Sequence, residues 1–444
     1  MNSLRRFVEK YLEKNSNPTW KIEPLYEKTF DNIIVIPALA EFNNVKLVIK
    51  SLAENDPKYI SETLILFVIN NTSSAESEIK SQNKSTITYL HNILYNNIND
   101  DLTEYIRSSG INLSYINAST HGYELPGKDG GVGLARKIGM DLSLKYFNYS
   151  TPGKRILICT DADCTFEKNY ITSIVDYFNM KNCGAAVVNY EHSMTGSTDI
   201  TRAIICYELY LRYYLLGLSY AGSSYAFHTI GSTMICDHEC YIKIGGMNKL
   251  KAAEDFYFLE KLSKITEIHT IRNTCVYPSP RPSFRVPFGT GQRVSRFLSK
   301  VRNEYLIYDP QSFIVLKHWL ELLDSLTKLN LSTILSESKS INLHLYKFLE
   351  ENNFVFFWEK ICVQNPSKQQ MARQKKFWFD AFRTLKLIHY LRDNAYPLTN
   401  VFDAIDKMLE ISGAPYKIPR EKSALPDLDK QKEYLLLLRK LQNN

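Results

Sequence analysis

From Arg155 to Glu167 the sequence reads RILICTDADCTFE, in which two aspartates follow a run of apolar residues. The run from Ile156 to Cys159 predicts a short, buried β-strand. Asp161 and Asp163 come after the carboxyl end of that strand, where open α/β sheets bind their ligands. Alternate residues of an extended chain share a face, so both carboxylates can bind one divalent cation. The stretch alone is equally compatible with a solvated acidic turn.

Apolar runs of the same kind precede and follow this stretch, and they alternate with segments of helical periodicity. We expect further strands at residues 31–37, 63–71, 111–117, 184–190, 228–236 and 269–276. We expect the intervening helices at residues 45–52, 87–95, 134–147, 170–179, 201–218 and 237–244, with another beginning at Glu254. Strands that alternate with helices at this spacing predict an α/β fold with a mostly parallel sheet flanked by helices.

The two ends of the chain differ from this central part. Residues 1–30 contain a short amphipathic helix and a proline-containing lead-in. Beyond residue 300 the alternation with strands stops, and helical spacing is found at residues 313–329, 341–350, 354–363, 369–393, 398–411 and 429–441. The sequence therefore predicts three parts: a helical lead-in (1–30), an α/β domain (31–300) and an α-helical C-terminal region (301–444).

Composition argues against several classes of protein. The 444 residues are 44% hydrophobic and 23% charged, with a net charge of +7, which is typical of a globular protein. This modest positive charge is compatible with an anionic substrate or a membrane surface, and the lack of a Lys/Arg block argues against a nucleic-acid partner. The first residues lack the apolar core of a secretory signal, and the longest charge-free run, residues 213–236, is too polar for a transmembrane helix.

The eight cysteines show no framework spacing, which fits the reducing environment of the cytoplasm. Cys236-Asp-His-Glu-Cys240 has the ligand types of a metal clip, but no second ligand pair follows at zinc-site spacing. We therefore expect a cytoplasmic protein without a structural zinc ion.

A glycine-rich segment, Gly127-Lys-Asp-Gly-Gly-Val-Gly133, precedes the helix expected at residues 134–147. Backbone amides of such a loop at a helix N-terminus can bind a phosphate. The segment does not end in the Gly-Lys-Ser/Thr of a P-loop, and a flexible glycine turn is an alternative interpretation. Arg136 and Lys137 lie one turn into the helix, from which either side chain can reach a diphosphate.

Two adjacent acids, Glu254 and Asp255, open another predicted helix shortly after Gly245-Gly246. The positive end of the helix dipole favours the ionised form of both carboxylates. Their role is either catalytic or the capping of that helix.

Taken in order, these features resemble the family-two glycosyltransferases, which have the GT-A fold. The matching segments are Ile33–Ala38 with Glu41, the strand ending in Asn70-Asn71, Gly133–Arg136, Asp161–Asp163, Ile244–Asn248 and Glu254-Asp255. The resemblance extends over residues 30–300. A single Asp-x-Asp motif is common, whereas the ordered series, with Gly-Gly shortly before Glu-Asp, is specific.

The resemblance implies transfer of a sugar from a UDP- or GDP-linked donor to an acceptor hydroxyl, with inversion at the anomeric carbon. Asp161 and Asp163 would bind Mg²⁺ or Mn²⁺, which clamps the donor diphosphate. Asp255 would act as the general base, with Glu254 beside it. The donor site implied in this way comprises Pro37, Ala38, Glu41, Asn70, Asn71, Lys128, Arg136, Asp161, Ala162 and Asp163. Contacts to the acceptor or the diphosphate are implied for Gly231, Ser232, Arg285, Gln292 and Arg296.

Two departures from the family pattern leave the donor and the product open. The second strand ends in Asn70-Asn71 where the family commonly has an aspartate that contacts the nucleoside, so the base of the donor is not specified. Processive members have a Gln-x-x-Arg-Trp motif, whereas this chain has Gln292-Arg-Val-Ser-Arg296-Phe297, with one extra residue and Phe in place of Trp. The acceptor is accordingly a carbohydrate, a lipid-linked molecule or another small molecule.

Two further segments each have two interpretations. Residues 277–291 are rich in Pro and Gly and contain two arginines, and they form either a loop that closes over the donor or a rigid linker between domains. Residues 370–376 are basic and precede three aromatic residues, Phe377, Trp378 and Phe379. They either contact an anionic membrane, at its inner face, or form a solvated basic side over an aromatic core.

Two other functional classes are alternatives. A nucleotidyltransferase also combines a parallel sheet with paired acids, but it needs a glycine- and lysine-rich loop directly after the first strand, where this chain has Ala38-Leu-Ala-Glu41. A non-catalytic protein that binds carbohydrates or nucleotide sugars would not need Asp161, Asp163 and Asp255 together.

Overall fold

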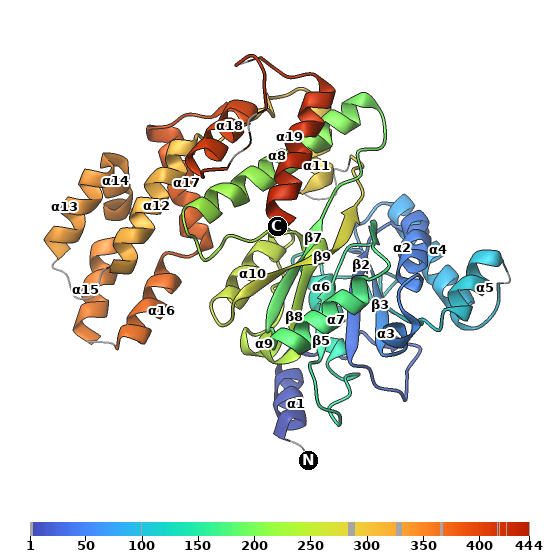
Figure 1. Cartoon of the computed structure of the whole chain (residues 1–444). Coiled ribbons are helices and arrows are strands. Elements are labelled where there is room, and N and C mark those ends of the chain that lie inside the picture. The colour runs from blue at the N-terminus through green and yellow to red at the C-terminus, as the bar shows by residue number, and fades with distance from the viewer. Residues whose placement is uncertain are drawn as a thin grey trace. The chain divides into compact units, whose positions relative to one another are not determined.

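The computed structural model describes residues 3–98, 100–282, 289–325, 331–364, 367–414, 416, 418–422 and 424–443. The chain divides into two compact units, which can be followed in Figure 1. The sheet unit contains the described residues of 1–193 and 229–280, and the helical unit contains those of 194–228 and 290–444.

A nine-stranded sheet organises the sheet unit, in the order β1-β4-β3-β2-β5-β8-β7-β9-β6. The strands are β1 (Ile22–Glu23), β2 (Asn32–Ala38), β3 (Thr63–Asn70), β4 (Asn112–Ala118), β5 (Ile156–Cys159), β6 (Cys164–Phe166), β7 (Ala185–Tyr190), β8 (Met234–Asp237) and β9 (Ile268–Pro278). Strands β4, β3, β2 and β5 pair in parallel, as do β7 and β9, whereas β1, β8 and β6 are antiparallel to their neighbours. Six of the nine strands therefore run in one direction, which confirms the predicted, mostly parallel sheet.

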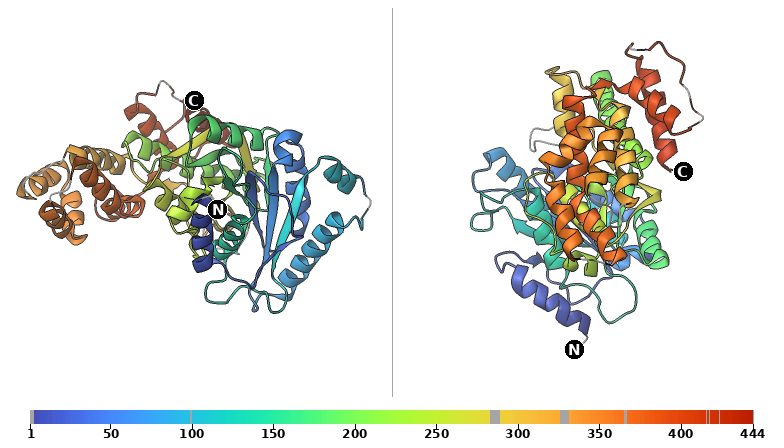
Figure 2. Two further views of the ribbon diagram at one scale, coloured as in Figure 1. Left: turned by 90° about the horizontal axis from the view of Figure 1, so that it is seen from below. Right: turned by 90° about the vertical axis from the view of Figure 1, so that its left-hand side faces the viewer.

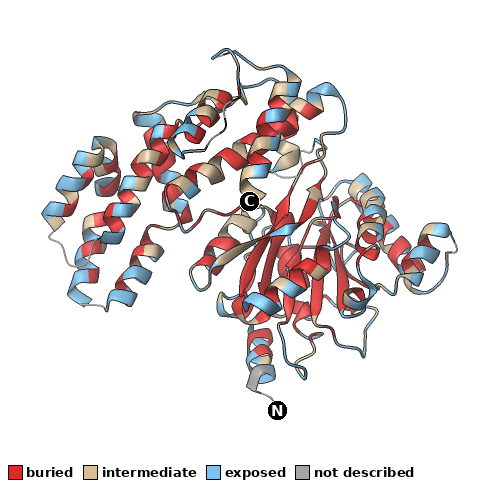
Figure 3. Cartoon of the chain, viewed as in Figure 1, coloured by how far each residue is buried: buried red, intermediate tan, exposed pale blue. Residues whose placement is uncertain are grey.

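The strands form where the sequence has short apolar runs. Every residue of β2, β3, β5, β7 and β8 is buried, as is typical of strands that are covered on both faces. Figure 3 shows this buried centre in red. Val35 of β2 pairs with Leu66 of β3 on one side and with Cys159 of β5 on the other. This parallel register places the carboxyl ends of the three strands at one edge of the sheet.

Helices flank the sheet (Figure 2). They are α1 (Ser3–Asn15), α2 (Phe42–Ala53), α3 (Pro57–Ser61), α4 (Ser77–Leu94), α5 (Asp101–Ser108), α6 (Val132–Ser143), α7 (Tyr170–Lys181), α9 (His238–Lys243) and α10 (Glu254–Ser263), with a 3₁₀ turn, η1, at Gly231–Thr233. Helix α6 packs on β2 and β3, where a Cβ atom at Gly139 would lie 2.4 Å from Val35 and 2.8 Å from Val68. Such a close approach needs a glycine, and it holds α6 directly against the centre of the sheet.

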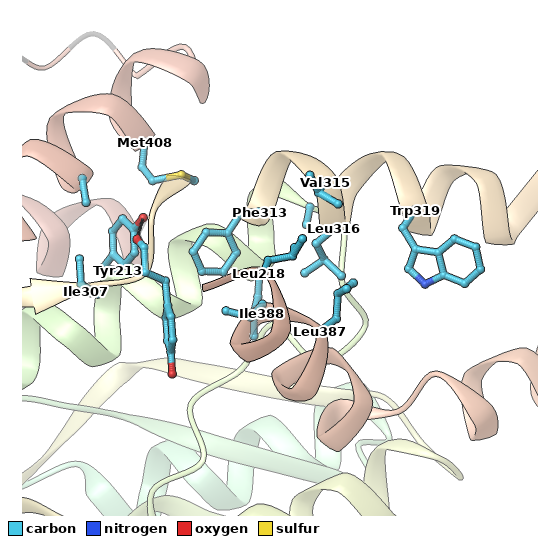
Figure 4. Close-up of a cluster of buried hydrophobic side chains, with 14 of the residues drawn as sticks. Tyr213, Leu218, Ile307, Phe313, Val315, Leu316, Trp319, Leu387, Ile388 and Met408 are labelled. Carbon is cyan, nitrogen blue, oxygen red and sulfur yellow. Dashed lines mark hydrogen bonds between the residues drawn. The ribbon is translucent and has the colours of Figure 1, made fainter. Parts of the chain in front are cut away.

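The helical unit is built around α8 (Thr198–Tyr220). Its other elements are α11 (Thr290–Leu298), β10 (Leu306–Ile307), α12 (Pro310–Ser325), α13 (Leu331–Ile341), α14 (Leu343–Glu351), α15 (Phe354–Gln364), α16 (Lys368–Trp378), α17 (Ala381–Asn394), β11 (Thr399–Asn400), α18 (Val401–Ile411) and α19 (Leu428–Asn443). Figure 4 shows its core, to which Tyr213, Phe313, Trp319, Leu387 and Met408 contribute buried side chains. Within the described residues, no helix combines the length and the apolar character that a membrane crossing requires.

A buried ionic cluster joins α8 to α19. Glu208 Oε1 accepts hydrogen bonds from Arg212 Nε at 2.7 Å and from Arg439 Nε at 2.8 Å. The segment 194–228, which the sequence places in the α/β domain, therefore packs with the C-terminal helices. The predicted boundaries at residues 30 and 300 themselves stay predictions.

The limits of several elements differ from the expected ones. The single helix expected at residues 369–393 is two helices, α16 and α17, because the Asp380 carboxylate caps the second by accepting a hydrogen bond of 2.9 Å from the Arg383 amide. The strand expected at residues 228–236 begins only at Met234, after η1. The helix expected at residues 87–95 is longer and begins at Ser77.

Candidate active site

Neighbouring strands end together at the carboxyl edge of the sheet. Ala38, Asn70 and Ala118 are the last residues of β2, β3 and β4, and Asp161 follows the end of β5 by two positions. Open α/β sheets bind their ligands at this edge. The first of the two predicted acidic motifs is thus placed where the topology favours a ligand site.

Arg136 of α6 links the two acidic motifs. Its Nη2 lies 2.5 Å from Asp161 Oδ1, and its Nη1 donates a hydrogen bond to Glu254 Oε1. The side chains of Arg136 and Glu254 are 3% and 6% exposed, whereas that of Asp161 is 36% exposed. We call these three residues together with Asp255 the Arg136 cluster. The fold brings together residues that are far apart in the sequence, and it leaves the Asp161 carboxylate accessible to a ligand.

A glycine makes room for the guanidinium group. A Cβ atom at Gly231 would lie between 2.3 and 2.7 Å from three atoms of the Arg136 guanidinium. Any side chain at position 231 would therefore displace Arg136 from its two carboxylates. Gly231 and Ser232 are buried in η1, and their predicted contact with an acceptor or a diphosphate stays a prediction.

Burial and charge set the protonation states within the Arg136 cluster. Burial acts to lower the pKa of Arg136, but the carboxylates of Asp161 and Glu254 outweigh it and hold that pKa well above its ordinary value. Burial and, next, the Glu254 carboxylate raise the pKa of Asp255 to about 7, and Arg136 opposes this rise. Asp255 is thus a carboxyl group that changes its charge near neutral pH, which is the property that a general base requires.

Two glycines of residues 127–133, Gly131 and Gly133, are explained by close packing against the segment that leads into α10. A Cβ atom at Gly133 would lie 2.3 Å from the carbonyl oxygen of Leu250. Lys251 Nζ donates a hydrogen bond of 2.9 Å to the Gly127 carbonyl oxygen. The close packing accounts for Gly131 and Gly133 without a bound phosphate, and it holds the start of α6 against the residues that precede α10.

We expect Gly133→Ala to lower the free energy of unfolding by about 1–3 kcal/mol, as overpacking commonly does. The added methyl group would meet a backbone oxygen, which cannot move as a flexible side chain would. Urea unfolding measures the change. Gly127→Ala is the matched control, because no atom lies within 4 Å of a Cβ at that position. Equal stability of the two variants would contradict the close packing.

The two asparagines at the end of β3 are held by hydrogen bonds within the protein. Asn70 Nδ2 donates to the Ala38 carbonyl at 3.2 Å, and Asn71 Nδ2 donates to the Ser119 carbonyl at 3.1 Å. Asn83 of α4 donates to Asn71 Oδ1 at 2.7 Å. These amides tie the ends of β2, β3 and β4 together, and a contact of Asn70 or Asn71 with a nucleoside stays a prediction. Asn83 lies in a polar segment, and no sequence pattern there indicates that its side chain supports the end of β3.

The other predicted donor residues differ in their exposure. Pro37 and Ala38 form the buried end of β2. Glu41 is buried, and its Oε2 accepts a hydrogen bond of 2.6 Å from Asn44 Nδ2. Lys128 is exposed in the glycine-rich loop. Their roles in donor binding stay predictions.

Lys137, which the sequence suggests as a diphosphate ligand, is paired within the protein. Its Nζ lies 2.9 Å from Asp141 Oδ2. Asp141 Oδ1 also accepts hydrogen bonds from the hydroxyls of Tyr11 at 2.8 Å and Tyr241 at 2.7 Å. This network attaches α1 and α9 to α6, and Lys137 and Asp141 line a cavity of about 110 Å³ beside α1. Lys137 therefore helps to attach the N-terminal helix, and its predicted contact with a diphosphate stays a prediction.

The remaining predicted contacts lie outside the sheet unit or outside the described residues. Gln292 and Arg296 belong to α11 of the helical unit. Arg296 Nη2 and Arg293 Nη1 donate hydrogen bonds to Glu304 Oε2 at 2.8 and 2.9 Å. Arg285 lies outside the described residues. Arg296 thus has an acidic partner within its own unit, and its predicted contact with substrate stays a prediction.

Asp161 and Asp163 fit a divalent metal that is shared with a ligand. Both are partly exposed, and they flank the buried Ala162. In the part of the chain that the structure describes, no three His, Cys, Asp or Glu side chains are grouped as a complete protein site would require. Mg²⁺ is commonly bound through one or two carboxylates, with substrate phosphates and water in its other positions. This donor set suits such an ion held together with a diphosphate.

Comparisons with known proteins give a limited structural similarity. No family model matches the chain, and no curated protein matches its sequence. The structure is similar to S. aureus TarS 1–349 in complex with UDP-GlcNAc, at 12% identity and a TM-score of 0.38, over 88% of this chain and 95% of that chain. It is also similar to the mannosyltransferase PcManGT from Pyrobaculum calidifontis in complex with GDP-Man and Mn²⁺, at 12% identity and a TM-score of 0.37, over 99% and 93% of the two chains. These values identify no family.

Proposed function

We propose that the protein is a metal-dependent, inverting glycosyltransferase that moves a sugar from a nucleoside-diphospho-sugar to an acceptor hydroxyl. The observation that carries this proposal is the Arg136 cluster, in which one buried guanidinium binds both Asp161 and Glu254. This guanidinium joins the carboxylate pair that suits a metal and a diphosphate to the helix start that carries Asp255, whose pKa is about 7. The cluster lies at the carboxyl edge of a mostly parallel sheet.

Asp161 and Asp163 would hold Mg²⁺ or Mn²⁺ together with the diphosphate of the donor. When bound, the metal neutralises the charge that develops on the departing nucleoside diphosphate. Arg136 binds one carboxylate oxygen of Asp161. The Asp161 side chain is 36% exposed, so about a third of its surface is accessible to a ligand. The donor would be linked to UDP or GDP.

Asp255 would take the proton from the acceptor hydroxyl. As the proton leaves, the hydroxyl oxygen bonds to the anomeric carbon, and the bond from that carbon to the diphosphate oxygen breaks on the opposite face. One displacement of this kind inverts the anomeric centre without a covalent enzyme intermediate. Because Arg136 binds both Glu254 and Asp161, it fixes the start of α10, and hence Asp255, relative to the donor site.

The decisive experiment is an assay for transfer and hydrolysis with Mn²⁺ and a panel of UDP- and GDP-sugars. Release of UDP or GDP that requires both Mn²⁺ and one particular sugar donor supports the proposal. If no nucleotide sugar binds or turns over while circular dichroism shows an intact fold, the proposal is wrong. Metal-independent binding without turnover would identify a non-catalytic binding protein. Release of sugar 1-phosphate in place of UDP or GDP, with UTP or GTP formed when pyrophosphate is added, would identify a nucleotidyltransferase.

We expect Asp163→Asn to weaken Mn²⁺-dependent binding of UDP or GDP by at least about tenfold, since even changes in the outer shell of a metal site have this effect. Calorimetry with the nucleotide, with and without Mn²⁺, measures the affinity. Asp176→Asn is the control, because Asp176 is an exposed residue of α7 whose Oδ1 accepts a hydrogen bond of 2.8 Å from the Tyr59 hydroxyl. Equal affinities for Asp163→Asn and the wild type would exclude Asp163 as a metal ligand.

A further inference from the structure

The hairpin formed by α15 and α16 exposes large apolar side chains. Phe356 is 69% exposed, Val363 is 86% exposed and Phe377 is 43% exposed. Phe354 and Trp358, which belong to the same hairpin, are almost fully buried. Apolar side chains that gather on one surface mark a site of interaction, whereas single ones are ordinary. The question is therefore whether Phe356, Val363 and Phe377 lie together on one surface.

In each helix the residues on the exposed side recur at intervals of three, four or seven, so they share a face of that helix. We call the following six residues the outer hairpin face: Phe356, Lys360, Val363, Gln370, Arg373 and Phe377. Figure 3 shows the exposed sides of α15 and α16 in pale blue.

The packing of the two helices puts both halves of this face on one side. Phe357 stacks on Trp378 with the ring centroids 4.9 Å apart, and Gln374 Nε2 donates to Gln364 Oε1 at 3.2 Å. Phe357, near the start of α15, meets Trp378 at the end of α16, whereas Gln364, at the end of α15, meets Gln374, which precedes Trp378 in α16. The two helices are therefore antiparallel. The buried side chains of both helices enter one core: Phe354, Trp358, Ile361, Met371 and Trp378. The outer hairpin face is turned away from that core.

The charge of the hairpin complements an anionic surface. Residues 354–378 contain five Lys or Arg residues and one Glu, which gives a net charge of +4 (5 − 1). Lys360 and Arg373 lie among the three apolar residues on the outer hairpin face, as does the exposed Glu359 at the same helical spacing. The Arg373 guanidinium lies 5.5 Å from the centroid of the Phe377 ring. Cations therefore stand directly beside the exposed apolar groups.

We propose that the outer hairpin face docks onto the surface of an anionic lipid bilayer. Phe356, Val363 and Phe377 enter the boundary between headgroups and acyl chains, and Lys360 and Arg373 bind the lipid phosphates. The long stems of Lys and Arg can lie along the apolar groups while their charged ends stay at the headgroups. This docking surface lies wholly within the helical unit, and it does not depend on the proposed sugar transfer.

The structure revises the basis of the membrane contact that the sequence suggests. Of the aromatic residues that follow the basic segment 370–376, Trp378 and Phe379 are buried and Phe377 is exposed. The other apolar members of the face come from α15. The structure shows the aromatic core on one side of the hairpin, and the membrane contact that we propose uses the apolar, basic face on the other side.

Sedimentation of the full-length protein with lipid vesicles tests this proposal. We expect binding to vesicles of phosphatidylcholine with phosphatidylserine, and at least about tenfold weaker binding to vesicles of phosphatidylcholine alone. The triple variant Phe356→Ser, Val363→Ser, Phe377→Ser should bind the anionic vesicles at least about tenfold more weakly than the wild type. The double variant Lys360→Gln, Arg373→Gln should bind the two kinds of vesicle with nearly equal affinity.

The matched control replaces two apolar residues that are equally exposed elsewhere, Met180→Ser and Leu25→Ser, which are 80% and 76% exposed in the wild type. This control should bind like the wild type, and thermal melting should show that all variants are folded. Wild-type protein that stays in solution with anionic vesicles would overturn the proposal, as would a triple variant that binds normally. Self-association that the triple variant abolishes, without vesicle binding, would also overturn it and assign the face to a second copy of the chain.

Discussion

The Asp255→Asn variant should lose sugar transfer but still bind the donor nucleotide. We expect kcat to fall by about 10²–10⁴-fold, the usual contribution of a general base, because an amide has the shape of the carboxylate but cannot take up the acceptor proton. The affinity for UDP or GDP with Mn²⁺, measured by calorimetry, should change by less than about threefold. A variant with full activity would remove Asp255 from the role of base.

The pH dependence of the wild type should report the same carboxyl group. Burial and the Glu254 carboxylate raise the pKa of Asp255 to about 7, so the base is protonated in acid and ionised above neutral pH. We therefore expect kcat/KM to rise about tenfold per pH unit below this pKa and to level off above it. The residual kcat/KM of Asp255→Asn should not show this rise with pH. A wild-type profile without the rise would contradict the assignment of Asp255 as the general base.

Stability gives an independent check that needs no substrate. The pKa of Asp255 is raised from about 3.9 in the unfolded chain to about 7 in the folded protein, so between these values the folded state binds more protons. The free energy of unfolding must then decrease as the pH rises through this window. Asp255→Asn should remove this part of the pH dependence, which urea unfolding at several pH values can measure.

The features that were predictable from the sequence are those with a local cause. The strands β2, β3 and β5 are buried on both faces, so they appear as continuous apolar runs, and their alternation with helical segments indicated a parallel sheet. The Asp161 and Asp163 motif stands at a strand end, and Glu254 stands at a helix start. Both places have recognisable sequence signals, which is why the two acidic motifs were found.

The features that were missed depend on contacts between distant residues. Arg136 and Glu254 are 118 positions apart, and no periodicity connects them. The sequence therefore suggests a phosphate contact for Arg136 but does not indicate that it links the two acidic motifs. The same holds for Gly133, whose need for a small residue comes from Leu250. Helix α8 has an ordinary helical pattern, and only its packing partners show that it belongs with the C-terminal helices.

The Arg136→Leu variant should lose about 3–5 kcal/mol of unfolding free energy, the usual cost of a buried charge without its partner. Glu254 has a 6% exposed side chain, and its carboxylate would lose the guanidinium that pairs with it. Urea unfolding measures the loss. Arg136→Lys should recover part of the stability, because a lysine keeps the charge but lacks the planar fork that binds two carboxylates at once.

The double variant Arg136→Leu, Glu254→Leu separates stability from function. It should regain most of the lost stability, because no unpaired buried charge remains, yet it should transfer sugar poorly because Asp161 and α10 are no longer joined. Arg136 also lowers the pKa of Asp255, so Arg136→Leu should move the pH profile of transfer to higher pH, which a loss of stability alone would not do. If Arg136→Leu keeps the wild-type stability and pH profile, the guanidinium does not couple the donor site to the base.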